Sequence, residues 1–203
     1  MTQLILASQS PRRKALLQQL GIPFEIQPSG VDEYTSTSDP LTLVRELSLA
    51  KAKDIASNYS NAVVIGADTI VVHDNDILGK PTSEQEAAQM LARLSGTQHL
   101  VYTGVCLQYV DRDGILQEPI LFHEQTNVWF QALSAYPIQK YIASGSPMDK
   151  AGAYGIQDDW GAIFVKKIEG DYYNVVGLPL SRCYLELSSL KERYKLDLQL
   201  STR

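Results

Sequence analysis

Residues 7–14 are Ala-Ser-Gln-Ser-Pro-Arg-Arg-Lys, and they join a strand-like apolar run over 4–7 to the start of a helix. Ser10 is a favourable N-cap, and Pro11 suits the first helical position. Because backbone N–H groups are free at the positive end of a helix, such a turn binds phosphate well. The arginine forks in the first helical turn also match phosphate oxygens. A capped helix with solvated basic residues has the same pattern, so the spacing alone leaves both interpretations open.

Length and composition limit the class of protein. A chain of 203 residues can bury a sizeable core in one domain or in two closely fused lobes. Its net charge of -5 disfavours binding of a nucleic acid polymer through a broad basic face. Cys106 and Cys183 lack metal-type spacing and are expected to be core thiols. With neither a charged leader nor an apolar stretch of membrane-spanning length, we expect a cytoplasmic protein without a membrane partner.

Strand-type and helix-type segments alternate along the chain, without a repeat or a low-complexity linker. This alternation predicts an α/β (mixed α+β) fold, with residues 1–203 forming a single domain of two lobes around a cleft. We expect helices over 11–21, 39–58, 83–96, 134–143 and 180–194. We expect strands over 4–7, 24–27, 62–66, 70–73 and 99–110, a ribbon continuing to about 132, and a hairpin formed by 162–168 and 172–176.

Asp68 stands between two apolar strand-type segments. An ionised carboxylate there needs a cation, hydrogen bonds or a catalytic purpose. The alternative is an Asp that accepts backbone N–H bonds in a turn. Glu33 and Glu46 are further carboxylates, which together with phosphate oxygens would suit the preference of Mg²⁺ for hard oxygen ligands. Taken singly, each of these glutamates is expected to be a solvated surface charge.

Several cations are candidates for binding a polyphosphate. Lys53 and Lys80 are expected to extend the cationic lining begun by Arg12 and Arg13, and four cations at one cleft would suit a triphosphate. Lys80 is the stronger of the two lysines because a glycine and a proline fix the backbone around it. Lys51, by contrast, is expected to lie on an exposed helix face.

The histidines and tryptophans carry no recognisable site motif. His73, His99 and His123 lie on strand-like segments without Cys or carboxylate at ligand spacing, so we expect structural roles for them. Trp129 and Trp160 are expected to pack in the core or between the lobes. Walker, dinucleotide-binding and nucleophile-elbow motifs are absent from the sequence.

Six blocks of sequence, in order and in register, cover nearly the whole chain. They are LASQSPRR at 6–13, VDE at 31–33, LAKAK at 49–53, IGADT at 65–69, LGKP at 78–81 and DKAGAYGIQ at 149–157. Together they resemble the Maf family of nucleoside triphosphate pyrophosphatases. The resemblance implies a central mixed sheet with a cleft, similar to the inosine triphosphate pyrophosphatases. It also implies hydrolysis of a nucleotide between its α and β phosphates, with a divalent metal.

Three positions are diagnostic of the base within the family that this chain resembles. The branch acting on dTTP and UTP has Arg, Thr and Gln, matched here by Arg12, Thr69 and Gln157, whereas the 7-methyl-GTP branch has Trp, Gln and Glu. A Gln amide offers both a donor and an acceptor to the edge of a pyrimidine. The run Asp158-Asp159-Trp160 departs from the family, which usually turns more briefly with glycine here, and is expected to reshape the rim of the base pocket.

The resemblance also implies roles for the remaining residues. Phosphates would be bound by Ser8, Arg13, Lys53 and Lys80. Glu33 and Asp68 would hold Mg²⁺ or Mn²⁺, and Asp68 would be the base that activates water. The partner is then a free nucleotide, and a homodimer follows from the resemblance alone. The alternatives are hydrolysis of modified pyrimidine nucleotides or of 7-methyl-GTP, and a non-catalytic nucleotide-binding regulator of cell division.

Overall fold

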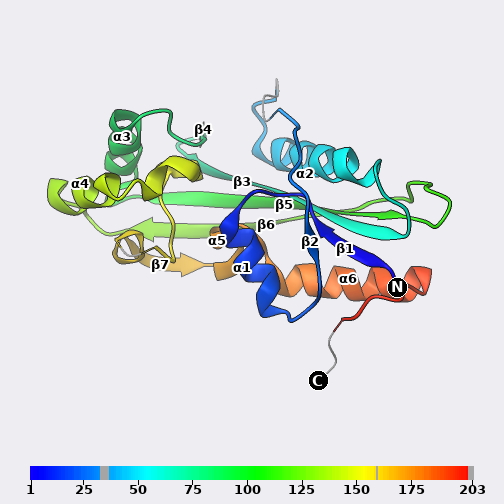
Figure 1. Ribbon diagram of the computed structural model, residues 1–203. Helices are drawn as coiled ribbons and strands as arrows, with labels where there is room; N and C mark the ends of the chain where they lie inside the picture. Colours follow the sequence, from blue (N-terminus) through cyan, green and yellow to red (C-terminus); the bar gives the residue numbers. More distant parts are fainter. Residues whose placement is uncertain (33–36, 159, 201–203) are drawn as a thin grey trace. The chain divides into compact units, whose positions relative to one another are not determined.

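The computed structural model describes residues 1–32, 37–158 and 160–200, and Figure 1 labels its helices and strands. Within these residues, seven strands form one sheet in the order β2-β1-β3-β5-β6-β7, with β4 paired to β3. The strands are β1 (Gln3–Leu6), β2 (Glu25–Ile26), β3 (Ala62–His73), β4 (Asp76–Leu78), β5 (Gln98–Val110), β6 (Ile120–Phe130) and β7 (Val165–Glu169). β1 runs parallel to β2 and β3, whereas β4 and β7 are antiparallel to their partners β3 and β6. The mixed α/β fold with a central mixed sheet is therefore confirmed.

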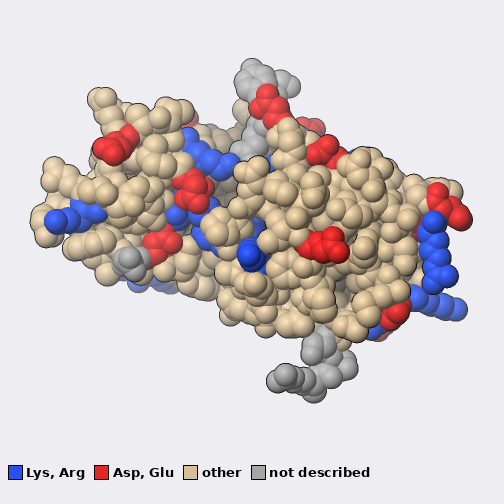
Figure 2. Space-filling view, in the orientation of Figure 1, with Lys and Arg blue, Asp and Glu red and all other residues tan. Residues whose placement is uncertain are grey.

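The helices complete the element order. They are α1 (Pro11–Gln19), α2 (Pro40–Ala56), α3 (Glu84–Leu94), α4 (Ala135–Ala143), α5 (Tyr172–Val176) and α6 (Leu180–Tyr194), with short 3-10 helices η1 (Ser146–Asp149), η2 (Ala151–Ala153) and η3 (Gly161–Ile163). Among the helices of the described residues, none has the length and apolar character needed to cross a membrane. On the face drawn in Figure 2, basic side chains occur in small groups separated by acidic and uncharged ones.

The chain divides into two compact units. The first unit contains Met1–Asp68, Thr103–His123 and Gly177–Arg203, and the second contains Thr69–Tyr102 and Glu124–Val176. The division falls within β3, β5 and β6, so one part of each of these strands belongs to the first unit and the other part to the second. The arrangement of two lobes around a cleft stays a prediction.

In the first unit, α2 lies directly against the sheet because two glycines permit it. A Cβ added at Gly66 on β3 would overlap the carbonyl oxygen of Ser48, and one at Gly104 on β5 would overlap that of Val44. Any larger residue would push the helix away from the strands. Apolar side chains close the surrounding core: Ile5, Ala7, Ala52, Ile55, Ala56, Ala62, Val64, Cys106 and Val110. Figure 1 shows α1 and α6 on the other side of β1 from α2.

The strand-to-helix turn at the start of the chain forms as the sequence predicts. The hydroxyl of Ser10 accepts a hydrogen bond from the backbone N–H of Arg13 at 3.4 Å, and Pro11 is the first helical residue. Leu16 and Leu17 are buried on the inner side of α1. Gly21, beyond the end of α1, has φ +66°, which favours glycine and stops the helix.

Two predicted features of the second unit are also present, one in altered form. The hairpin of β3 and β4 turns through Asp74 and Asn75, whose φ values of 50° and 67° suit a tight two-residue turn. Ser83 caps α3 by accepting from the N–H of Glu86 at 3.1 Å. In a capping box the carboxylate of Glu86 would accept from the backbone N–H of Ser83. Here it accepts instead from the backbone N–H and hydroxyl of Thr82, the residue before Ser83.

The region around Asp68 is one continuous strand rather than two strands joined by a turn. β3 runs unbroken over Ala62–His73, so the separate strands predicted over 62–66 and 70–73 are wrong. β3 pairs with β1 over residues 62–65 and with β4 over residues 71–73, and β5 is its neighbour in the sheet, so both halves are held in one extended strand despite the small and polar residues between them. The interpretation of Asp68 as a turn residue is therefore wrong as well.

The predicted closing hairpin is wrong in its second half. β7 pairs with β6, whereas Tyr172–Val176 forms the short helix α5. The carboxylate of Asp171 accepts from the N–H of Tyr173 at 2.8 Å, which starts a helical turn. The buried amide of Asn174 donates to the carbonyl of Val101 at 3.1 Å and to the hydroxyl of Thr126 at 2.9 Å. These side-chain bonds override the strand propensity of the segment.

The buried thiols and imidazoles have structural environments, as the sequence predicts. Cys106 and Cys183 are free, and burial raises the pKa of each thiol to about 12. His73 shares a hydrogen bond of 3.1 Å with the hydroxyl of Thr97. His99 shares one of 2.8 Å with the hydroxyl of Tyr154 and packs edge-on against its ring. Burial lowers the pKa of His99 from 6.5 to about 3.

We expect His99 to make the free energy of unfolding depend on pH. The unfolded chain protonates this imidazole below pH 6.5, whereas the folded protein keeps it neutral until about pH 3. Because the unfolded state then binds more protons, stability falls as the pH falls through that window, by about 1.4 kcal/mol per pH unit. His99→Gln keeps a polar group for Tyr154 but removes the titration. Urea unfolding of both proteins should show the wild type losing about 2 kcal/mol more than the variant between about pH 7.5 and about pH 5. Parallel pH profiles would contradict this.

Candidate active site

The turn before α1 gathers hydrogen-bond donors around a buried serine. The hydroxyl of Ser8 accepts from the backbone N–H of Ser10 at 3.1 Å and from Nη1 of Arg13 at 3.3 Å. Nε of Arg13 donates to the backbone carbonyl of Gly177, just before α6, at 2.8 Å. The guanidinium is therefore held between β1 and the start of α6 in a defined position. Arg12 is half-buried and points in another direction, because successive residues on a helix are about 100° apart.

The centre of β3 carries an ion pair between buried residues. Asp68 is 6% exposed and Lys51 is 7% exposed, and Nζ of Lys51 lies 2.7 Å from Oδ1 of Asp68. Residues i and i+2 of a strand share a face, so Asp68 lies on the face where Gly66 meets α2. The close approach of that helix brings Lys51 to the carboxylate. The sequence predicted that Asp68 needs a cation, hydrogen bonds or a catalytic purpose, and α2 supplies a cation.

The expectation that Lys51 is exposed is wrong. Lys51 belongs to a helical stripe of buried residues on α2: Val44, Leu47, Ser48, Lys51, Ala52 and Ile55. Its position in that stripe is a signal that could have placed it correctly, because the spacing of three and four residues marks one helix face. A lysine can join an apolar face because its methylene stem packs there while the ammonium finds a partner.

Lys53 and Glu46 lie on the exposed side of the same helix. Two residues along a helix correspond to about 200°, so Lys53 points roughly opposite to Lys51. Glu33 lies outside the described residues. Of the predicted residues in the first unit, the structure therefore brings Ser8 and Arg13 together. It pairs Asp68 with Lys51, a residue that was expected to be exposed and had no predicted site role.

The second unit contains the other predicted residues. Thr69 follows Asp68 on β3 and is half-buried, and Lys80 is exposed after β4. The carbonyl of Gly79 accepts from the backbone N–H of Gly152 at 3.0 Å, which ties the loop of Lys80 to η2. Gly152 has φ +66°, and a Cβ there would press on Val71, so the glycine is required.

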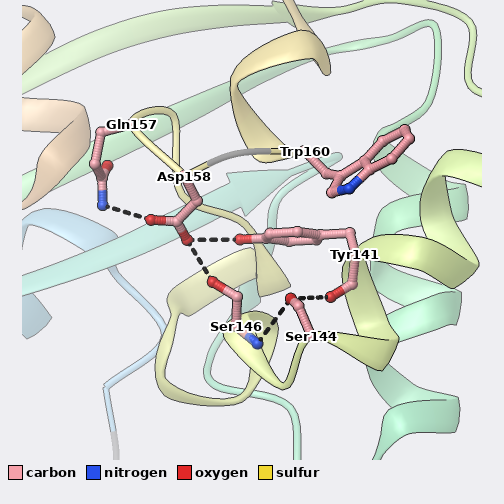
Figure 3. A pocket seen from close by; sticks show the side chains of 6 residues that line it. All are labelled: Tyr141, Ser144, Ser146, Gln157, Asp158 and Trp160. Carbon is pink, nitrogen blue, oxygen red and sulfur yellow. Dashed lines mark hydrogen bonds between the residues drawn. The ribbon is translucent and has the colours of Figure 1, made fainter.

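Gln157 lies at an open pocket of about 250 Å³ in the second unit (Figure 3). The pocket is lined by Tyr141, Ser144, Ser146, Gln157, Asp158 and Trp160. Trp160, predicted to pack in the core or between lobes, is half-buried at this pocket, with its ring edge-on to Tyr136. Trp129 is also half-buried, with the ammonium of Lys167 4.6 Å from its ring centroid.

Asp158 is the centre of the polar contacts at this pocket. Its Oδ2 accepts from the hydroxyl of Tyr141 at 2.9 Å and from that of Ser146 at 2.7 Å, and lies 3.0 Å from Nζ of Lys150. Its Oδ1 accepts from the amide of Gln157 at 3.0 Å. Burial raises the pKa of Tyr141, so this phenol stays protonated and acts as a donor.

A divalent metal would find a suitable donor in Asp68. Its carboxylate is a hard oxygen ligand, and Mg²⁺ commonly takes only one or two carboxylates together with phosphate oxygens and water. Over residues 1–32, 37–158 and 160–200, no group of three or more His, Cys, Asp or Glu side chains is arranged to hold a metal. The metal site at Glu33 and Asp68 stays a prediction.

The family resemblance is borne out by comparison with known proteins. The family model for Maf-like proteins matches residues 3–190. The chain belongs to the Maf family. Similar members are 52% identical over 183 residues in Symbiobacterium thermophilum, 51% over 191 residues in Geobacillus sp. (strain WCH70) and 46% over 203 residues in Agathobacter rectalis. These alignments cover 90%, 94% and 94% of this chain and 91%, 99% and 98% of the relatives. All three relatives are named dTTP/UTP pyrophosphatase.

Sequence reasoning gave no role to two residues that organise the second unit of this Maf-family chain. Lys150 stands inside one of the family blocks and is 7% exposed, although lysine is seldom buried without a partner. From the sequence, Asp158 is distinguished only as part of a run that departs from the family pattern. A charged residue directly before a glycine-rich segment is the signal that could have pointed to Lys150, because a nearby carboxylate would then be required.

We expect replacement of Lys51 to destabilise the protein strongly. Lys51→Met leaves the Asp68 carboxylate buried without this cation, which typically lowers the free energy of unfolding by about 3 to 5 kcal/mol. The matched control, Lys53→Met on the exposed side of α2, should change it by less than about 0.5 kcal/mol. Urea denaturation of the three proteins measures both values. Equal stability of the two variants would show that the buried pair is unimportant.

Proposed function

We propose that this chain is a nucleoside triphosphate pyrophosphatase that hydrolyses dTTP and UTP to the monophosphate and pyrophosphate. The observation that carries the proposal is the similarity to relatives of that name, about half identical over nine-tenths or more of both chains. The buried carboxylate of Asp68 supports catalysis, since a protein that only binds nucleotide does not need a group to activate water. Arg12, Thr69 and Gln157 match the pattern expected of the dTTP and UTP branch.

Phosphate binding is assigned to the donor-rich turn and to two lysines. The Ser8 hydroxyl, the N-terminus of α1 and the forked guanidinium of Arg13 are suited to phosphate oxygens. Lys53 and Lys80 are exposed, Lys53 on the side of α2 opposite to Lys51, and their assignment to the remaining phosphate charge rests on the sequence alone. Positioning and neutralisation of charge account for most of the acceleration in phosphoryl chemistry.

Asp68 is assigned as the base that accepts a proton from the water attacking the α phosphorus. An ionised carboxylate has about four lone-pair sites on two oxygens, so the bond to Lys51 leaves capacity to accept that proton. The ammonium of Lys51 fixes the direction of the carboxylate. As water bonds to the α phosphorus, the bond to the bridging oxygen breaks, and pyrophosphate leaves with that oxygen.

A divalent ion, Mg²⁺ or Mn²⁺, is the proposed cofactor. Asp68 would hold it together with Glu33 and the phosphate oxygens of the substrate. When bound, such an ion neutralises charge on the phosphates. We also propose, from the family resemblance, that the protein is cytoplasmic and forms a homodimer. A free nucleotide rather than a nucleic acid polymer is the proposed partner, in keeping with the net charge of -5.

The proposal is tested by a panel of nucleotides. Pyrophosphate release from dTTP, UTP, CTP, GTP and 7-methyl-GTP is measured with Mg²⁺ and separately with Mn²⁺. Release from dTTP and UTP well above the others is expected. Preference for 7-methyl-GTP would move the chain to the other branch of the family, and preference for modified uridine triphosphates would identify a different physiological substrate. Tight nucleotide binding without release from any of them would favour a regulator.

We expect Asp68→Asn to lower kcat for UTP by about 10² to 10⁴, the usual contribution of a general base. The substitution also removes a charge from the pair with Lys51, so the urea unfolding curve must be measured alongside to confirm that the variant is folded. Asp113→Asn, in the exposed turn between β5 and β6, is the control and should retain wild-type kcat. Near-normal kcat in a folded Asp68→Asn protein would refute the assignment of the base.

A further inference from the structure

The amide of Gln157 has one orientation that the neighbouring carboxylate imposes. Its Nε2 donates to Oδ1 of Asp158 at 3.0 Å. An ionised carboxylate only accepts hydrogen bonds, so the nitrogen end of the amide must face it and the oxygen end must turn away. Figure 3 shows the amide nitrogen of Gln157 directed at the carboxylate of Asp158 beside the pocket. The residue expected to contact the base thus presents an acceptor.

Asp158 is itself held by donors that leave it little freedom. The hydroxyl of Tyr141 accepts from the backbone N–H of Gly155 at 3.0 Å, so its own proton is directed to Oδ2 of Asp158. The hydroxyl of Ser146 donates to the same oxygen. The buried ammonium of Lys150, which can only donate, lies 3.0 Å from it. With Oδ2 fixed by three groups, Oδ1 is directed at Gln157.

We propose that Asp158 is a positioning residue for base selectivity: it holds the Gln157 amide so that the carbonyl oxygen meets the imide N–H of a pyrimidine. This inference rests on the proposed function. Uracil and thymine carry a hydrogen at N3, whereas N3 of cytosine is an acceptor. An acceptor held opposite N3 therefore favours the first two bases and opposes the third, because two lone pairs would face each other. The substrate class is a nucleotide with an imide N–H at the base edge.

A single isosteric substitution should reverse the group that Gln157 presents. In Asp158→Asn, the donors Tyr141, Ser146 and Lys150 still require an oxygen at the Oδ2 position. The introduced amide nitrogen must then occupy the Oδ1 position and donate toward Gln157. Gln157 responds by turning its oxygen to that nitrogen, which presents its own Nε2 to the base. The acceptor at the pocket becomes a donor without a change in volume.

The test compares kcat/KM for UTP and CTP, two substrates of nearly the same shape. The wild-type ratio of UTP to CTP should fall by about tenfold or more in Asp158→Asn, which corresponds to the difference between a good and a mismatched hydrogen bond. The matched control is Asp149→Asn, which removes another carboxylate bound to Lys150, 2.7 Å from its Nζ, and so tests whether the loss of any charge at this ammonium changes the ratio. The control should keep the wild-type ratio. Gln157→Ala should also lower the ratio.

The outcomes separate this inference from the proposed function. If the wild type releases no pyrophosphate from UTP or dTTP, the proposed function fails and this inference fails with it. If the wild type prefers UTP but folded Asp158→Asn loses activity equally toward both substrates, the role of Asp158 is only structural and this inference alone is overturned. If urea denaturation shows that Asp158→Asn is not folded under the conditions of the kinetic assay, Asp158→Ala replaces it. That variant frees the Gln157 amide and should also lower the ratio of UTP to CTP. An unchanged ratio in that variant overturns the inference as well.

Discussion

The first unit depends on the close approach between the backbone of α2 and the sheet. Gly66 and Gly104 have no side chain to keep the helix away, so carbonyl groups of α2 lie against β3 and β5. This contact turns one face of α2 into the core, and the lysine on that face must then find a negative partner away from water. Asp68, two residues after Gly66 on the same side of β3, is that partner. Removing water from both charges is unfavourable, so the pair persists only because the packing around it fixes its geometry.

Local signals were sufficient for much of the fold. Ser10 with Pro11 and Asp39 with Pro40 set the starts of α1 and α2, and Asp74 with Asn75 set the turn between β3 and β4. Each of these features is decided by a few neighbouring residues. The errors arose where distant residues decide. β3 continues through its small and polar centre because β1 and β4 pair with its two halves and β5 lies beside it in the sheet. α5 replaces a strand because the Asn174 amide reaches Val101 and Thr126.

In the candidate site, too, features decided by neighbouring residues were predictable, and features decided by distant residues were not. The turn at Ser8 and Arg13 followed from its cap and its cations, and the structure supplies the bonds that hold Arg13. Lys51 was predicted to be exposed because it is charged, although its spacing places it on the buried face of α2. The contacts of Asp158 were not predictable, since its partners come from α4, η1 and the segment after it, which only folding brings together. Glu33 lies outside the described residues, so its role stays a prediction.

The hydrogen bond from Arg13 to Gly177 joins residues 164 positions apart. During synthesis the amino-terminal residues leave the ribosome first, so β1 and α1 can form long before the carbonyl that orients the guanidinium exists. Until then the arginine can keep its local contact with Ser8 but cannot make the bond to Gly177. The turn before α1 therefore reaches its final geometry late, after nearly the whole chain has been made. A nascent or carboxyl-terminally truncated chain would carry the helix without the finished cradle, which makes the ordering of this arginine a marker of completed folding.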